Sequence, residues 1–105
     1  MGPSTSRRIL LSASALLMCC ALPGCAGAPV QEMSNARQAI RAARDAGAEQ
    51  VASQQLTEAK AFLEQAEASL QTRAYRDARR NAVAARGKAV EALEAAQTTA
   101  RKGSG

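Results

Sequence analysis

Histidine and tryptophan are absent from this chain of 105 residues, which has only one phenylalanine and one tyrosine. All three cysteines lie between positions 19 and 25. The chain therefore lacks the side chains for a Cys/His metal site, for cysteine catalysis in its main part or for a Ser-His-Asp triad. A glycine-rich phosphate-binding loop is also missing. We expect no catalytic residue, no metal site and no cofactor, so we expect the protein not to be an enzyme.

Acidic residues are missing before Glu32, and the first part of this stretch has the features of a secretory signal. Arg7 and Arg8 form a short basic region, and an apolar run follows over residues 9–22. This run of about 14 residues suits a signal peptide but is shorter than the roughly 20 residues that a membrane-spanning helix needs. We therefore expect residues 1–24 to be a signal peptide rather than a retained membrane anchor.

The signal ends in Leu22-Pro23-Gly24-Cys25, which resembles the lipobox of bacterial lipoproteins. That motif has an aliphatic residue, two further positions and then the cysteine, with a small residue directly before it. Gly24 meets this requirement, whereas Pro23 is a less usual occupant of its position. The resemblance implies cleavage before Cys25, a diacylglycerol on its sulfur and an acyl chain on the new amine.

Other processing sites fit the sequence less well. Cys19 and Cys20 follow residues that are not the usual small Gly or Ala, and a cut after Ala28 would place Pro29 directly behind the cleaved bond. If Cys25 is acylated and the other cysteines leave with the signal, the mature protein has no free thiol and no disulfide.

Lipidation also predicts a location. Two or three acyl chains on one cysteine make membrane attachment effectively permanent. Ala26 stands where an Asp would resemble an inner-membrane retention signal, so we expect an outer-membrane anchor with the protein facing the periplasm. The mature chain keeps a mild excess of basic residues, which does not indicate binding to nucleic acid.

Beyond a short tether over residues 25–29, apolar residues recur in steps of three and four, as on one face of a helix. The first segment has Met33, Ala36, Ile40, Ala43 and Gly47. The second has Leu56, Ala59, Leu63, Ala66 and Leu70. The third has Tyr75, Ala78, Ala82, Ala85 and Ala89, followed by Leu93 and Ala96. We call these residues the helix seam, and they predict an all-α domain over residues 30–100.

Breaks between the helices are also predicted. Gly47 with Ala48 ends the first helix, because Gly adopts the left-handed conformation of a C-cap most easily. Ser53 is the expected N-cap of the second helix. Residues 71–74 shift the seam and suit a tight turn, although good helix formers there also allow one continuous helix. The fold is therefore an antiparallel helical hairpin or a short three-helix bundle, with a flexible tail at residues 101–105.

Alanine dominates the seam, so the helices can pack closely, as in a coiled coil, but bury little apolar area. The resulting core is thin and predicts marginal stability, to which a partner or self-association would add burial. Basic residues flank the first and third segments, and the middle one is acidic, which favours antiparallel neighbours. Its carboxylates are expected on a solvated face rather than in a catalytic pair: Glu58, Glu64 and Glu67.

Arginines at helical spacing form a candidate anion-binding stripe, which we call the arginine stripe. It comprises Arg73, Arg76, Arg79 and Arg80. Such a stripe would bind lipid head groups, lipopolysaccharide phosphates or acidic glycan. The alternative is a solvated face that pairs with Asp77 and with the acidic helix. Tyr75, which opens the third segment, is expected to close the end of the core.

These features resemble the bacterial lipoprotein family named domain of unknown function 4398. The residues that carry the resemblance are Gly47-Ala48, then Leu56, Ala59, Leu63 and Ala66, then Tyr75, Ala78, Arg79, Ala82 and Ala85. It covers roughly residues 30–97, although Ala52-Ser53 stands where members often have Ala-Pro. Members stand alone as lipoproteins or precede an OmpA-like peptidoglycan-binding domain. The family has no established activity, so the resemblance implies location and fold rather than mechanism.

The sequence thus predicts a non-enzymatic, lipid-anchored envelope protein whose helices serve an interaction or structural role. Its expected partners are the membrane, and an envelope protein, peptidoglycan or a second copy of the chain. One alternative is a wall-linking protein resembling murein lipoproteins. Those end in a Lys that is joined to peptidoglycan, whereas Lys102 is followed by Gly103-Ser104-Gly105 here. The other is an anion-binding module that uses the arginine stripe.

Overall fold

The computed structural model describes residues 28–104, and all but the short connections among them are helical. The helices are α2 (Val30–Asp45), α3 (Ala48–Val51), α4 (Ser53–Gln71) and α5 (Tyr75–Ser104). The described part of the chain contains no strand. The all-α prediction is therefore confirmed. The predicted signal peptide, the lipobox and Cys25 lie outside the described residues.

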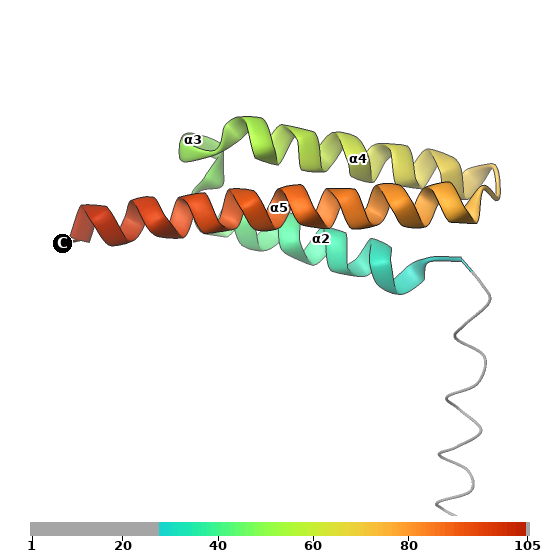
Figure 1. Cartoon of the computed structure of the whole chain (residues 1–105), viewed down its shortest axis with the longest axis horizontal. Helices are drawn as coiled ribbons and strands as arrows, with labels where there is room; N and C mark the ends of the chain where they lie inside the picture. The colour runs from blue at the N-terminus through green and yellow to red at the C-terminus, as the bar shows by residue number, and fades with distance from the viewer. Residues whose placement is uncertain (1–27, 105) are drawn as a thin grey trace, which may run out of the picture.

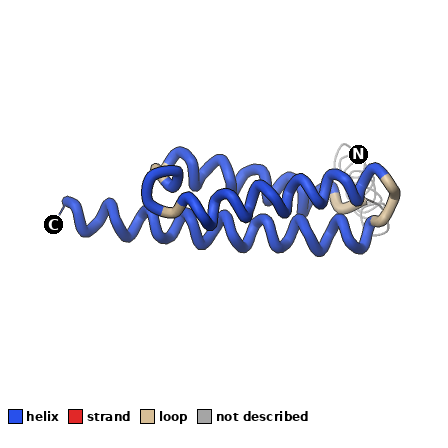
Figure 2. The backbone as a smooth tube through the Cα atoms, turned by 90° about the horizontal axis from the view of Figure 1, so that it is seen from above, coloured by secondary structure: helices blue, strands red, loops and turns tan. Residues whose placement is uncertain are grey.

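The three long helices form a bundle (Figure 1). α2 and α5 run in the same direction, and α4 runs antiparallel to both. α5 packs along α4 and along α2, whereas the contact between α2 and α4 is smaller. With 30 residues, α5 is about 45 Å long, and its C-terminal turns extend past the other helices (Figure 2). Of the two predicted arrangements, the structure has the three-helix bundle.

The end of α2 follows the prediction, but the start of α4 does not. Gly47 has the left-handed φ of 90° expected after a helix C-cap, and its N–H bonds the carbonyl of Arg44. The short helix α3 then follows, which the sequence pattern did not predict. Ser53 is the first residue of α4 rather than its N-cap, because α3 leads through Ala52 directly into α4 without a side-chain cap.

A tight turn separates α4 from α5, so the two are not one continuous helix. The N–H of Ala74 bonds the carbonyl of Ser69 at 2.9 Å, and the N–H of Arg73 bonds that of Leu70 at 3.1 Å. This pair of bonds is the Schellman motif, in which the residue after the C-cap is left-handed. Here that residue is Arg73, with φ of 60°, rather than glycine.

The core consists mainly of alanine. Fully covered seam residues include Ala36, Ala43, Ala59, Ala66, Ala78, Ala82, Ala85 and Ala89. The largest fully buried side chains are Met33, Leu56 and Pro29. Met33 packs with Ala66 and Ala82 near one end, a second cluster surrounds Leu56, and Leu63 packs against both. The helices thus meet through small side chains, with few large residues between them.

Three details of the predicted seam and tail differ from the structure. Tyr75 is 38% exposed, because it begins α5 at the end of the bundle and does not close the core. Ala92 is buried in place of Leu93, which lies at the edge of the seam, since α5 continues in steps of three and four from Ala89. Residues 101–104 are the last turn of α5, where we expected a flexible tail.

Candidate functional site

α2 and α5 both begin at the same end of the bundle, next to the predicted tether. The N–H of Val30 bonds the carbonyl of Ala28 at 2.8 Å across Pro29, whose φ of −78° and ψ of 60° are those of an inverse γ-turn. Pro29 is buried, so the chain is held firmly where it enters α2. The turn at residues 72–74 and the start of α5 lie at the same end (Figures 1 and 2). We call this the tether end.

The arginine stripe lies on α5 and the preceding turn, but its members are in different environments. Arg79 donates from Nε to Glu32 Oε1 on α2 at 3.1 Å. Arg80 pairs with Asp77 on its own helix at 3.6 Å.

Arg73 and Arg76 are exposed, and neither forms an ion pair within the described chain. The predicted stripe therefore contains two internally neutralised arginines and two cations at the tether end that have no counter-charge.

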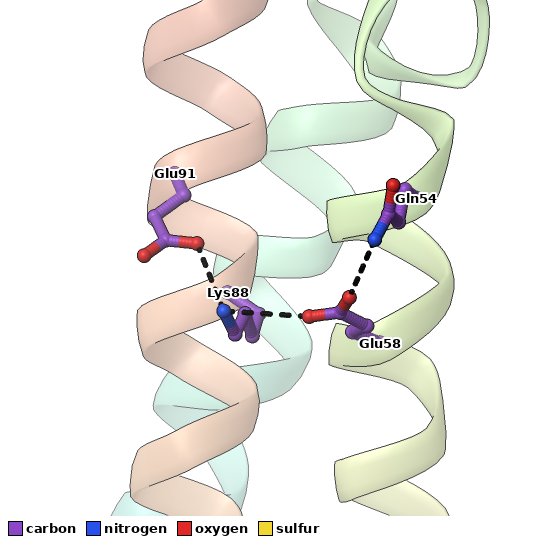
Figure 3. Close-up of polar contacts among 4 residues, drawn as sticks. All are labelled: Gln54, Glu58, Lys88 and Glu91. Atoms are coloured by element: carbon purple, nitrogen blue, oxygen red, sulfur yellow. Dashed lines mark hydrogen bonds and ion pairs between the residues drawn. The ribbon is translucent and has the colours of Figure 1, made fainter.

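Further ion pairs join the helices along their flanks. Arg37 on α2 lies 3.9 Å from Glu67 on α4. Lys88 on α5 bridges Glu58 on α4 at 3.3 Å and Glu91 at 3.4 Å, and Gln54 also donates to Glu58 (Figure 3). The bonds to Glu58 and then Glu91 raise the pKa of the Lys88 ammonium. The predicted pairing of an acidic middle helix with basic neighbours is thus present.

A hollow of about 200 Å³ lies between α2 and α4. It is lined by Arg37, Ile40, Arg41, Arg44 and Leu63. Two of its arginines are already paired, Arg37 with Glu67 and Arg44 with Glu49 at 3.3 Å. No polar or charged side chain among the described residues is buried, so this hollow presents no enclosed polar group to a ligand.

Residues 28–104 contain no group of three or more His, Cys, Asp or Glu side chains placed to hold a metal ion. Within the same range, no helix combines the length and apolar character needed to cross a membrane.

Comparison with known families decides the assignment. The model of the family described as domain of unknown function (DUF4398) matches residues 31–103. The chain belongs to this family. No curated protein and no solved structure matches the chain. The resemblance read from the sequence is therefore confirmed, and the DUF4398 match spans α2 to α5, which are the elements of the bundle.

Sequence reasoning missed the contacts that hold the DUF4398 bundle in register. Lys88 and Glu91 are three residues apart on one helix, and this spacing could have been recognised as a pair. The cross-helix partners Glu58 and Glu32 could not, since their pairing depends on how the helices slide along each other. The division of the arginine stripe follows from that same register, because Glu32 on α2 reaches Arg79 but neither Arg73 nor Arg76.

Proposed function

We propose that this DUF4398 protein is a non-enzymatic, lipid-anchored protein of the bacterial cell envelope, in which a helical bundle on an acylated Cys25 serves as an interaction or structural module. The sequence Leu22-Pro23-Gly24-Cys25 is the observation that carries the proposal. Ala28, which follows Cys25 by three positions, already belongs to the packed entry of α2 through its bond to Val30.

The packing of the bundle supports an interaction role. Its seam is mostly alanine, so each contact buries little area and the fold is expected to be only marginally stable. A bundle of this kind gains stability when another helix or a second copy covers more of its surface. The flanking ion pairs are exposed, and pairs of that kind add under about 1 kcal/mol each.

Lipidation is tested by labelled palmitate. The wild-type chain should incorporate the label and fractionate with the outer membrane, whereas a Cys25→Ser variant should do neither. A Cys20→Ser variant is the matched control and should behave as the wild type. Mass analysis of the mature N-terminus then identifies the acylated residue. Equal labelling of the wild type and the Cys25→Ser variant would contradict the proposal.

The interaction role is tested separately by cross-linking in intact cells, followed by sedimentation of the purified protein over a wide concentration range. We expect either a specific envelope partner or a concentration-dependent oligomer. A well-folded monomer at all concentrations, with no cross-linked partner, would remove the interaction role and leave only the anchor.

Wall attachment is a second candidate, which the position of Lys102 favours. Lys102 is exposed in the last turn of α5, about 40 Å along that helix from Tyr75 at the tether end. An amine at this distance from the lipid would suit a linker between membrane and cell wall. Digested cell wall should then contain a covalently retained fragment that a Lys102→Arg variant lacks. Its absence from wild-type wall would exclude this role.

A further inference from the structure

We propose that the tether end of the bundle docks on the membrane that carries the lipid anchor, with Arg73 and Arg76 against the phosphates of its head groups. This inference rests on the proposed lipidation of Cys25. It adds an orientation and a second, electrostatic contact to the acyl anchor.

The position of the tether end is the first argument. Three residue steps separate Cys25 from Ala28, and an extended chain covers at most about 10 Å over that separation. Pro29 is buried and Val30 is bonded back to Ala28, so the bundle is joined to this short connection at a fixed point. An acylated Cys25 therefore holds the tether end next to the bilayer surface.

The charge of that end is the second argument. Arg79 and Arg80 are neutralised by Glu32 and Asp77, whereas Arg73 and Arg76 have no ion pair within the described residues. Because α2 and α5 run parallel, both also begin at the tether end, where their backbone dipoles are positive. Of the three long helices, only α4 ends there and places the negative end of its dipole at the tether end. The two unpaired arginines and the two helix N-termini thus favour anionic groups at the tether end.

Side chains at the tether end also suit an interface between water and lipid. Tyr75, the only tyrosine, is 38% exposed. In the sequence it lies between the two unpaired arginines. Val30 is 71% exposed at the start of α2. A phenol with one apolar and one polar edge is favoured at the level of lipid head groups, and an exposed aliphatic residue at the same end of the bundle adds apolar contact.

The conformation of Arg73 supports the same reading. Its φ of 60° is one that glycine adopts far more easily, and glycine is the usual residue at this position of a Schellman motif. An arginine there has a conformational cost and forms no ion pair within the bundle. A charged contact outside the bundle would account for it.

The basic residues at the far end of α5 lie too far from the tether to compete. Arg101 and Lys102 are in the last turn of α5, about 40 Å along that helix from Tyr75. A three-residue tether cannot bring this distal end to the bilayer unless the whole bundle lies flat. An upright bundle and a flat one are therefore distinguishable by a reporter near each end of α5.

The strength of the contact suits a tethered protein. Each basic residue near an anionic membrane changes the docking equilibrium constant about five-fold, so two change it about 25-fold. That is too little to recruit a free protein stably. It is enough to orient one that the lipid already holds at high local concentration. Added salt should weaken the contact.

The experiment uses the full, acylated protein in vesicles that contain phosphatidylglycerol and bromine-labelled lipid. Because the chain has no tryptophan, Tyr75→Trp and Gln97→Trp each supply a single fluorescent reporter, the first at the tether end and the second at an exposed distal position of α5. We expect the Tyr75→Trp fluorescence to be quenched by the lipid and the Gln97→Trp fluorescence to be unaffected. Vesicles of phosphatidylcholine alone should quench Tyr75→Trp less.

A charge test in the Tyr75→Trp background completes the design. Replacing Arg73 and Arg76 by Gln should lower the docking equilibrium constant about 25-fold. The matched control replaces Arg41 and Arg86, which are also exposed and without an ion pair in the described chain, and should leave quenching unchanged. Equal loss in both double variants would contradict the proposal, because net charge and not the tether end would then be responsible.

Acylation is measured on the same samples by mass analysis, which distinguishes a failure of docking from a failure of lipidation. Acylated protein whose two reporters are quenched equally, or not at all, would contradict docking and leave the anchor intact. Protein without acyl chains on Cys25 would contradict the proposed function, and the docking inference with it.

Discussion

Arg79 of α5 donates a hydrogen bond of 3.1 Å from Nε to Oε1 of Glu32, which lies in the first turn of α2. The two residues are 47 positions apart, and their side chains are 47% and 28% exposed. The pair therefore fixes the parallel register of α2 against α5 at the tether end. Glu32 gains further from its position in the first turn, where the helix dipole favours a negative charge.

The first prediction concerns this pair. A double-mutant cycle with Arg79→Gln and Glu32→Gln should give a coupling energy of about 0.5 kcal/mol, since both side chains are partly solvated. Urea unfolding followed by circular dichroism measures it. Glu32→Gln alone should lower the free energy of unfolding by more than this coupling energy, because the dipole of α2 loses its favourable negative charge as well. The control cycle is Arg80 with Asp77, which joins no two helices. A coupling of zero between Arg79 and Glu32 would contradict the register role.

Two glycines should respond to alanine in opposite directions. Gly87 is exposed within α5, and an added Cβ would meet no other atom within 4 Å, so Gly87→Ala should stabilise the bundle by about 1 kcal/mol through helix propensity. Gly47 has φ of 90°, so Gly47→Ala should destabilise it by about 1–2 kcal/mol through backbone strain. Midpoints of urea unfolding for the two variants test this. Shifts of the same sign would be inconsistent with the capping role of Gly47.

The alanine seam should not tolerate a larger residue. Ala82 is fully buried and packs with Met33 and Ala66, so Ala82→Leu should destabilise the bundle by about 1–3 kcal/mol through overpacking. Ala61→Leu adds the same volume at an exposed position of α4 and should be nearly neutral. Thermal unfolding compares the two. If Ala82→Leu raised the melting temperature, the helices would not be as closely packed as the structure indicates.

Lys88 makes the stability of the bundle depend on pH in the alkaline range. Its ammonium donates hydrogen bonds to Glu58 and Glu91, and these raise its pKa above the ordinary 10.5. The folded state holds this proton more tightly than the unfolded chain does. Its contribution to stability is therefore complete below pH 10.5 and is lost as the pH rises through the raised pKa.

The measurement compares unfolding of the wild type and a Lys88→Gln variant below and above that pH. The difference between them should shrink on the alkaline side. Lys60→Gln is the control, because Lys60 forms no ion pair within the described residues, and its difference from the wild type should stay constant. A Lys88 difference that grew with rising pH would have the wrong sign.

The helical periods and the first break could be predicted because each has a local signal. Apolar steps of three and four mark the seam, and Gly47 marks a left-handed residue. Arg73 is the left-handed residue after α4, but arginine does not indicate that conformation. The sequence therefore predicts the turn but not the residue that forms it. Leu93 was assigned to the seam in place of Ala92 because side-chain size favours leucine, whereas the helix phase places the alanine inward.

The candidate site was less predictable, because its character depends on which arginines find a carboxylate. Spacing alone places Arg73, Arg76 and Arg80 on one face of the helix and Arg79 near the edge of the seam. Only the packing of α2 beside α5 brings Glu32 to Arg79 and leaves Arg73 and Arg76 at the tether end. Such contacts depend on the axial offset between helices, which the sequence pattern leaves undetermined.

The conformation of Arg73 allows its structural and membrane roles to be separated. With φ of 60°, Arg73→Gly should keep the turn and raise stability by up to about 1 kcal/mol, because glycine adopts this conformation without strain. The same change removes one unpaired cation from the tether end, so the equilibrium constant for docking on anionic vesicles should fall about five-fold. Arg76→Gln should lower the docking equilibrium constant equally, and any gain in stability should stay within about 1 kcal/mol, because it removes a cation from the positive end of the α5 dipole and relieves no backbone strain. If Arg73→Gly raised stability but left docking unchanged, Arg73 would be excluded from the membrane contact.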